Sequence, residues 1–304
     1  SSDAVKTLDT KAAASKLGVA NILTGSVRRS PQMLRINAQL VGGTDGVEKW
    51  SQSYDRAPGD AIEIQTDIAA NVARAMSIAL DHAGNAALTL GGTADSAAQD
   101  LYLRARKMYF TTDDIRPPIA LLDAAIARDP TYADAWNLKA RAFDYWATTS
   151  PDTEEKLGQA ETAARRTIAI APRLGSAYAT LARILANRLE FRSAWGNMRR
   201  GLALSPQDAD VLAPAVRFFS CFGEPHTALD LADRAITLDP LEGNSYSNRG
   251  DALRLALRDY PQAIDAYRKA LALAPEVSGA HVSIGHCLML TNRAAQATAE
   301  FAKA

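Results

Sequence analysis

From about residue 97 onward, apolar residues recur at the three- and four-residue spacing of amphipathic helices, and the apolar stretches end at regularly placed prolines. Proline stops a helix because it lacks the backbone N–H and clashes with the preceding turn. A period near 34 residues closed by proline predicts stacked helical hairpins, and such α-solenoids usually present surfaces to partners. At intervals of 42, 34, 34 and 35 residues stand Pro130, Pro172, Pro206, Pro240 and Pro275.

Two columns of small residues run through these units when each proline is counted as position 32 of a 34-residue repeat. The two helices of a hairpin cross closely only where bulky side chains are absent. Small residues at positions 20 and 27 would allow such a close crossing. Position 4 holds large residues in most units, which we expect to fill the groove between successive hairpins. Position 20 contains Ala160, Ala194, Ala228, Ala263 and Ala297; position 27 contains Ala125, Thr167, Gly201, Ala235, Ala270 and Ala304; position 4 contains Trp136, Tyr178, Leu212, Tyr246 and His281.

These columns resemble the tetratricopeptide repeat family over about residues 97–304. About six repeats fit: the first is degenerate, the second carries eight extra residues that we place at 148–155, and the last stops at Ala304. The resemblance implies a protein-interaction function, with the first helix of each hairpin (helix A) lining a concave face and the second (helix B) lying outside. Because a solenoid with an open apolar end is a liability, we expect another segment or a partner to cover the last repeat.

The first 56 residues follow a different pattern. A short helix is expected at Lys11–Leu17, ended by a glycine. Three stretches with strand character follow, and turn residues separate them, so we predict a three-stranded antiparallel meander. An amphipathic helix at Ala61–Asp81 should pack on this sheet. The predicted strands are Ala20–Arg29, Met33–Val41 and Val47–Tyr54.

Residues 82–96 are small, polar and glycine-rich, which predicts a linker between a subdomain at 1–81 and the repeats at 97–304. The expected fold is mainly α: a right-handed tetratricopeptide-type α-solenoid preceded by a small α+β subdomain with three antiparallel strands. The first region resembles the second half of the TolB amino-terminal-like domain, which precedes tetratricopeptide repeats in bacterial regulators and nucleotidyl cyclases. The resemblance rests on Lys16–Val19, Leu23–Arg29, Leu34–Leu40, Gly46–Trp50 and Tyr54–Arg56.

The opening strand and first long helix of that domain have no counterpart in the sequence. One edge and one face of the sheet would then lack their usual cover. We therefore expect either a homodimer through this region or a sheet docked against another chain.

The tetratricopeptide resemblance implies that positions 2, 5, 9, 12 and 13 of helix A point inward. Basic residues at position 9 would concentrate positive potential in the groove, and arginine binds carboxylates with two hydrogen bonds, so we expect an acidic peptide or terminal carboxylate there. A second interpretation stays open, in which these arginines pair with Asp134, Asp144 or Asp210. The candidate groove residues are Lys107 (or Arg106, because the first repeat allows either register), Arg141, Arg183, Arg217 and His286, with Asn137 and Asn248 nearby and Asp251 interrupting the basic column.

Charge and motif content narrow the function further. Lys+Arg and Asp+Glu both total 34, so no overall attraction to nucleic acid is expected, and charges interrupt every apolar stretch, so no membrane span is expected. Cys221 and Cys287 are predicted to be buried thiols. The four histidines lack metal-ligand spacing, and no phosphate loop or nucleophile motif occurs, so we expect no metal, no cofactor and no catalytic activity.

Three functional hypotheses follow. The first is a protein-interaction or regulatory module of a larger bacterial signalling protein. The second is the carboxy-terminal regulatory region of a class III adenylate or guanylate cyclase. The third is the sensor region of a membrane-anchored transcription regulator with a winged helix. The residues do not distinguish the last two, and they allow either a cytoplasmic or a periplasmic location.

Overall fold

The computed structural model describes residues 8–30, 32–56, 64, 67–69, 71–72, 75–76, 90–112, 114–275 and 279–304. These residues belong to two compact units, one containing Leu8–Trp195 and the other Gly196–Ala304. The predicted linker at 82–96 lies mostly outside the described residues, so the predicted domain boundary stays a prediction.

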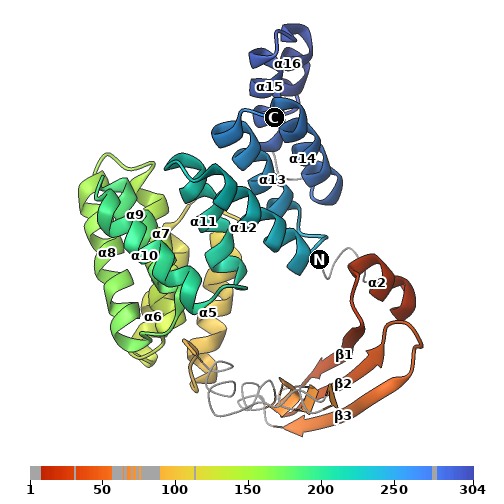
Figure 1. The fold of residues 1–304 in the computed structure, drawn as a ribbon. Helices are drawn as coiled ribbons and strands as arrows, with labels where there is room; N and C mark the ends of the chain where they lie inside the picture. Colours follow the sequence, from red (N-terminus) through yellow and green to blue (C-terminus); the bar gives the residue numbers. More distant parts are fainter. Residues whose placement is uncertain are drawn as a thin grey trace. The chain divides into compact units, whose positions relative to one another are not determined.

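The amino-terminal region is a helix followed by a three-stranded antiparallel meander in the order β1-β2-β3, as predicted (Figure 1). Helix α2 (Thr10–Leu17) begins at Asp9, whose carboxylate accepts from the Ala12 N–H at 2.8 Å, and ends at Gly18 in the left-handed conformation. A bulge between Leu40 and Val41 interrupts the pairing of the last two strands. The strands are β1 (Asn21–Arg29), β2 (Leu34–Gly42) and β3 (Glu48–Arg56).

One face of the sheet is apolar and only partly covered. Much of the predicted helix at 61–81 lies outside the described residues, but Ile64 is 1% exposed and packs with Leu34 and Tyr54. Over β1 the same face is open, with Leu23 49% and Val27 66% exposed.

The helical region consists of successive antiparallel hairpins, as the proline spacing predicted, and no strand occurs in the described part of 97–304. In the first unit the helices are α5 (Ser96–Tyr109), α6 (Arg116–Arg128), α7 (Ala133–Ala147), α8 (Thr153–Ile170) and α9 (Gly175–Asn187), with α10 (Phe191–Leu204) crossing into the second. The second unit continues with α11 (Ala209–Cys221), α12 (Pro225–Leu238), α13 (Gly243–Asp251), the π-helical segment η2 (Ala252–Leu257), α14 (Tyr260–Leu273), α15 (Gly279–Leu290) and α16 (Ala294–Phe301).

The small and large columns behave largely as predicted. The alanines at position 20 are all 0% exposed, and at position 27 Ala235 is partly exposed and Ala304 exposed. The aromatic residues at position 4 have a second role, because their polar tips donate to the carbonyl of the proline six residues earlier. This bond ties helix A to the turn before it. It joins Trp136 to Pro130 at 3.1 Å, Tyr178 to Pro172 at 3.0 Å and Tyr246 to Pro240 at 3.1 Å.

Positions 8 and 24 form a further pair that the sequence did not reveal. Gly250 at position 8 faces the ring of Tyr267 at position 24, and Gly285 faces Phe301 in the next hairpin. The preceding hairpin has Val216 at position 8, and the residue at its position 24 is an alanine. Where position 8 on helix A is a glycine, position 24 on helix B is therefore aromatic, and where position 8 is larger, position 24 is small. Either combination fills the space where the two helices cross.

The longer repeat intervals are explained by the helices themselves. The eight extra residues of the second repeat lengthen two parts of it, the loop at 148–152 and helix α8. Helix α8 has 18 residues, whereas the other B helices from α6 to α14 have 13 or 14. The one extra residue between Pro240 and Pro275 coincides with η2, because a π-helical turn accommodates one residue more than an α-helical turn.

Candidate functional site

Arg183 is engaged by an acidic side chain of the preceding hairpin. Its Nε lies 2.6 Å from Oδ2 of Asp144, a carboxylate at position 12 of α7 that is 4% exposed. The same carboxylate accepts a hydrogen bond from Asn187 at 2.9 Å. Because the buried Nε and Nη2 of Arg183 make no hydrogen bond of good geometry, the contact with Asp144 is mainly electrostatic. For Arg183, this contact agrees with the interpretation in which the arginines at position 9 pair with acidic residues of the protein itself.

Arg141 is also held by position 12 of the hairpin before it, here by aromatic rings. Its guanidinium carbon lies 5.5 Å from the centre of the Tyr109 ring and 6.0 Å from that of Phe110. Phe110 is 62% exposed, so this cation–π contact lies at the surface. Tyr145 at position 13 of α7 is 43% exposed, and Lys107 is exposed on α5 one turn before Phe110.

Asn137 lies between two A helices. It is 6% exposed, and its Nδ2 donates to Ser176 Oγ of α9 at 3.2 Å. Its Oδ1 is buried without a hydrogen-bond partner among the described atoms. The amide therefore joins α7 to α9 at a position that the family resemblance assigns to the groove.

The remaining candidate residues belong to the second unit. Arg217 is exposed on α11, Asn248 is half-buried on α13, and His286 is exposed on α15 with its ring 5.6 Å from that of Phe301. Asp251, which interrupts the basic column, accepts a 2.7 Å hydrogen bond from the Tyr267 hydroxyl. Burial raises the pKa of Tyr267, and the neighbouring Asp251 carboxylate adds to this, so the hydroxyl stays protonated and donates.

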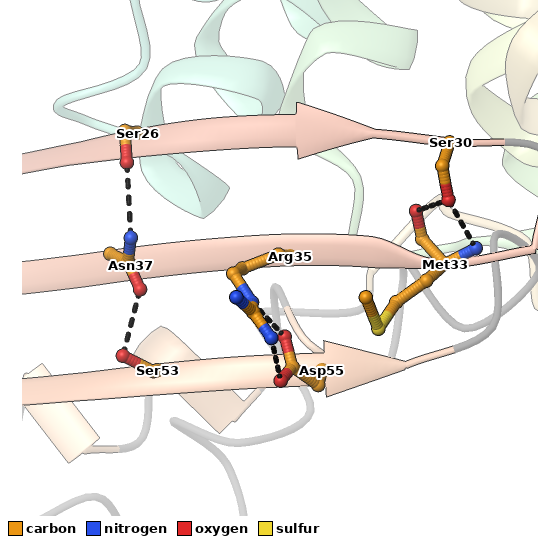
Figure 2. Close-up of polar contacts among 7 residues, drawn as sticks. All are labelled: Ser26, Ser30, Met33, Arg35, Asn37, Ser53 and Asp55. Carbon is orange, nitrogen blue, oxygen red and sulfur yellow. Dashed lines mark hydrogen bonds and ion pairs between the residues drawn. The ribbon is translucent and has the colours of Figure 1, made fainter.

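The sheet carries a polar hollow that the sequence did not indicate. About 580 Å³ in volume, it is lined by hydroxyl and amide side chains of all three strands. Asn37 of β2 is one of these side chains and lies between Ser26 and Ser53 (Figure 2): its Nδ2 donates to Ser26 Oγ at 3.2 Å, and its Oδ1 accepts from Ser53 Oγ at 2.7 Å. Beside it, Arg35 donates two hydrogen bonds to Asp55, at 2.6 and 2.8 Å. These groups satisfy one another across the strands, which stabilises the exposed face.

A second hollow, of about 370 Å³, lies between α12, α13 and α14. Arg249 Nε donates to Asp233 Oδ1 at 2.7 Å on one side of it, and the Lys269 ammonium lies 5.9 Å from the centre of the Tyr246 ring on the other. Its charges are thus balanced within the protein. Repeat counting singled out Tyr246 at position 4, but Asp233, Arg249 and Lys269 stand in none of the columns that it used.

The two cysteines differ in environment, which corrects one expectation. Cys287 is buried, and burial raises the pKa of its thiol, so it packs as a small apolar group. Cys221 was expected to be buried as well, but as the last residue of α11 it is exposed. Phe218 and Phe219 beside it are buried.

Among the described residues, no three side chains of His, Cys, Asp or Glu come close enough to hold a metal ion. Within the same part of the chain, none of the helices combines the length and the apolar character that crossing a membrane requires.

Comparison with known proteins identifies the fold. No protein-family model matches the sequence. The chain is 34% identical over 102 residues to a protein named putative adenylate cyclase 3 of Rhizobium meliloti strain 1021; the match covers 34% of this chain and 17% of that protein. The chain thus spans less than a fifth of that relative.

Two solved structures share the helical arrangement. The tetratricopeptide protein TTC0263 of Thermus thermophilus aligns with a TM-score of 0.53 at 18% identity, covering 64% of this chain and all of the other. The human IFIT1 dimer with m7Gppp-AAAA aligns with a TM-score of 0.57 at 14% identity, covering 79% of this chain and 55% of that one. The helical region therefore has the tetratricopeptide-type α-solenoid fold, whereas the likeness of the sheet region to the TolB amino-terminal-like domain stays a prediction.

Proposed function

We propose that the helical region is a non-catalytic protein-interaction module whose helix-A face binds an acidic segment of a partner protein. The observation that carries this proposal is the surface formed by Lys107, Phe110, Arg141 and Tyr145, which we call the α5–α7 surface. It combines two cationic side chains with two aromatic side chains that are 62% and 43% exposed. Aromatic residues and arginine supply most of the binding energy at protein interfaces.

The chemistry of this surface favours an acidic ligand with apolar side chains. Phe110 and Tyr145 can bury apolar groups, while Lys107 and Arg141 attract carboxylates. Arg183 and Asn137 would support the groove indirectly, because both are already engaged between α7 and α9. In the second unit, Arg217, Asn248 and His286 stay candidate partner-binding residues of their own helix A.

Fluorescence anisotropy with a labelled peptide of glutamate and leucine tests this proposal. Arg141→Ala should weaken binding about tenfold, in line with the loss of one interface arginine, and raising the salt from about 0.05 to about 0.5 M should weaken it further. The matched control is Arg104→Ala, which removes the same charge from an exposed site on α5 that pairs with Asp100.

Three outcomes would contradict the proposal. The first is the absence of peptide binding, and the second is an equal loss in Arg104→Ala and Arg141→Ala. The third is tighter binding of a labelled oligonucleotide than of the peptide, which the zero net charge of the chain does not favour.

We further propose that this module regulates a larger bacterial signalling protein, and the similarity to a putative adenylate cyclase favours a class III cyclase as that protein. In that case catalysis belongs to a separate domain. Cyclic nucleotide synthesis by the parent protein should change when residues 1–304 are deleted. A parent with a winged helix and no cyclase activity would instead support the sensor hypothesis.

A further inference from the structure

One side of helix α5 presents two apolar side chains with a cationic side chain between them. Leu103 and Phe110 are 49% and 62% exposed, and Lys107 is exposed as well. The three residues are spaced by four and by three positions, and Phe110 directly follows α5 in the α-helical conformation, so all three share one side of the helix. We call these residues the α5 stripe. Lys107 and Phe110 also belong to the α5–α7 surface, and Leu103 extends that surface along α5.

The α5 stripe is exposed although the following helix A packs beside it. Counted from Pro130, Leu103 and Phe110 are positions 5 and 12 of their repeat. In α7 these positions hold Asn137 and Asp144, which are 6% and 3% exposed and contact α9. Helix α7 likewise contacts α5, yet Leu103 and Phe110 stay exposed. The following hairpin therefore leaves this apolar surface accessible to a ligand.

Charge on this side of α5 favours an acidic partner over a second copy of the chain. Lys107 has no ion-pair partner among the described residues, whereas Arg104 lies 3.9 Å from Asp100. The guanidinium of Arg141 lies beside the Phe110 ring and adds a second positive charge. A two-fold contact would bring these cations against themselves, which like-charge repulsion opposes. An acidic partner instead meets them with complementary charge.

The spacing of the two apolar residues distinguishes a helical partner from an extended one. Seven residues of α-helix rise about 10.5 Å, which is the separation of Leu103 and Phe110 along the axis of α5. In a helical ligand that lies along α5, side chains seven residues apart have the same separation. In an extended ligand, side chains on one face are about 6.7 or about 13.4 Å apart, so neither spacing matches both apolar residues of the stripe.

We propose that the α5 stripe binds an acidic amphipathic helix of the partner protein, laid along α5. Two apolar residues of that helix, seven positions apart, contact Leu103 and Phe110. An acidic residue three or four positions after the first of them contacts Lys107. This inference rests on the proposed function, and it adds Leu103 to the binding surface and a helical form to the ligand.

Fluorescence anisotropy of the full chain with two labelled peptides of identical glutamate, leucine and alanine content tests the inference. In one peptide the leucines are seven residues apart with glutamates between them, which puts them on one face of a helix. In the other the same residues are reordered so that the leucines are two residues apart. The helix-patterned peptide should bind at least about tenfold more tightly. Far-UV circular dichroism should show a gain of helix when it binds.

A pair of leucine variants tests the contact itself. Leu103→Ala should weaken binding of the helix-patterned peptide about tenfold, as expected for the loss of an apolar contact at the centre of an interface. Leu103 is half exposed, so the variant should fold, and unchanged circular dichroism of the free protein would confirm this. The matched control is Leu238→Ala on α12, a residue of similar exposure, 48%, which should leave binding unchanged.

The outcomes separate this inference from the proposed function. Equal binding of the two peptides, or binding without a gain of helix, would overturn the helical partner and leave the acidic ligand of the α5–α7 surface standing. An equal effect of Leu103→Ala and Leu238→Ala would also overturn it. Failure of both peptides to bind would contradict the proposed function as well. A dimer in analytical ultracentrifugation that Leu103→Ala abolishes would assign the α5 stripe to a second copy of the chain instead.

Discussion

Replacing Gly250 with alanine should destabilise the second unit although it improves helix propensity. A Cβ atom built on Gly250 would lie 2.6 Å from Cε1 and 2.8 Å from Cζ of the Tyr267 ring. Carbon atoms in favourable contact are about 3.5–4.0 Å apart, so the overlap is about 1 Å. The ring is 0% exposed, and its hydroxyl is fixed by Asp251 at 2.7 Å and by Arg254 at 3.1 Å. It therefore has little freedom to move aside.

The sign of the effect follows from two opposing contributions. Alanine in a helix interior is about 1 kcal/mol more favourable than glycine. Overpacking a filled core site costs about 1–3 kcal/mol, so Gly250→Ala should lower the free energy of unfolding by up to about 2 kcal/mol. Gly196 in α10 provides the control, because a Cβ atom there would meet no atom within 4 Å. Gly196→Ala should therefore raise stability by about 0.5–1 kcal/mol.

Urea unfolding followed by far-UV circular dichroism measures both changes in the same unit. The midpoint should fall for Gly250→Ala and rise for Gly196→Ala. Adding Tyr267→Leu to Gly250→Ala should recover part of the loss relative to Tyr267→Leu alone, because the two sites are in contact. A Gly250→Ala midpoint at or above that of the wild type would refute the reasoning, since the ring would then have moved without cost.

Two further predictions concern charged groups. Arg183→Ala should lower the free energy of unfolding by about 1–3 kcal/mol, because it leaves the buried Asp144 carboxylate without its cation. The control Arg217→Ala, at an exposed site, should change the free energy of unfolding by less than about 0.5 kcal/mol. Equal urea midpoints for the two variants would contradict this. Burial raises the pKa of Glu300, but hydrogen bonds, led by that with His281, outweigh burial and leave the pKa below its ordinary value of 4.5. The stability that the ionised Glu300 contributes is therefore present above about pH 4.5 and lost as the pH falls through the lowered pKa. Glu300→Gln should reduce the loss of stability on acidification. A pH profile of stability that the substitution leaves unchanged would argue against this role of Glu300.

The hairpins were predictable because each follows from a local rule. The prolines at position 32 each follow the end of a helix B, and alanine at position 20 marks a close crossing in each repeat that has it. The strands followed from period-two alternation, and their observed bounds differ from the predicted ones by one or two residues. The sequence did not reveal the pairing of Gly250 with Tyr267. The two residues are 17 positions apart and become neighbours only when helix A packs against helix B.

The candidate groove was less predictable, for a physical reason. Counting from the prolines places Arg141 and Arg183 in the same column, but their surroundings are set by position 12 of the preceding hairpin. That position holds an aromatic residue before Arg141 and a buried carboxylate before Arg183. Asp144 was among three acidic residues that the sequence offered as partners, and only the structure selects it. The exposure of Cys221 likewise depends on where α11 ends.

The 35-residue interval shows how one inserted residue changes a repeat. In three hairpins the residue between helix A and helix B that adopts the left-handed conformation stands at position 15: Leu189, Gly223 and Asn292. In the longer repeat it is Arg258, at position 16, and η2 lies just before it. The extra residue is therefore absorbed within helix A, while the crossing at Ala263 is preserved at 0% exposure.

The cost of this insertion lies in the polar groups that accompany it. Arg254, within η2, donates to the Tyr267 hydroxyl, which in turn donates to Asp251. A chain of hydrogen bonds thus runs beside a crossing that is apolar in the preceding hairpin, where Val216 and Ala232 are both 0% exposed. A buried polar chain of this kind is stable only when every member is satisfied. The packing of the repeat with the inserted residue thus depends on a specific side-chain geometry, and this is why we expect an added carbon on the glycine that faces Tyr267 to destabilise it.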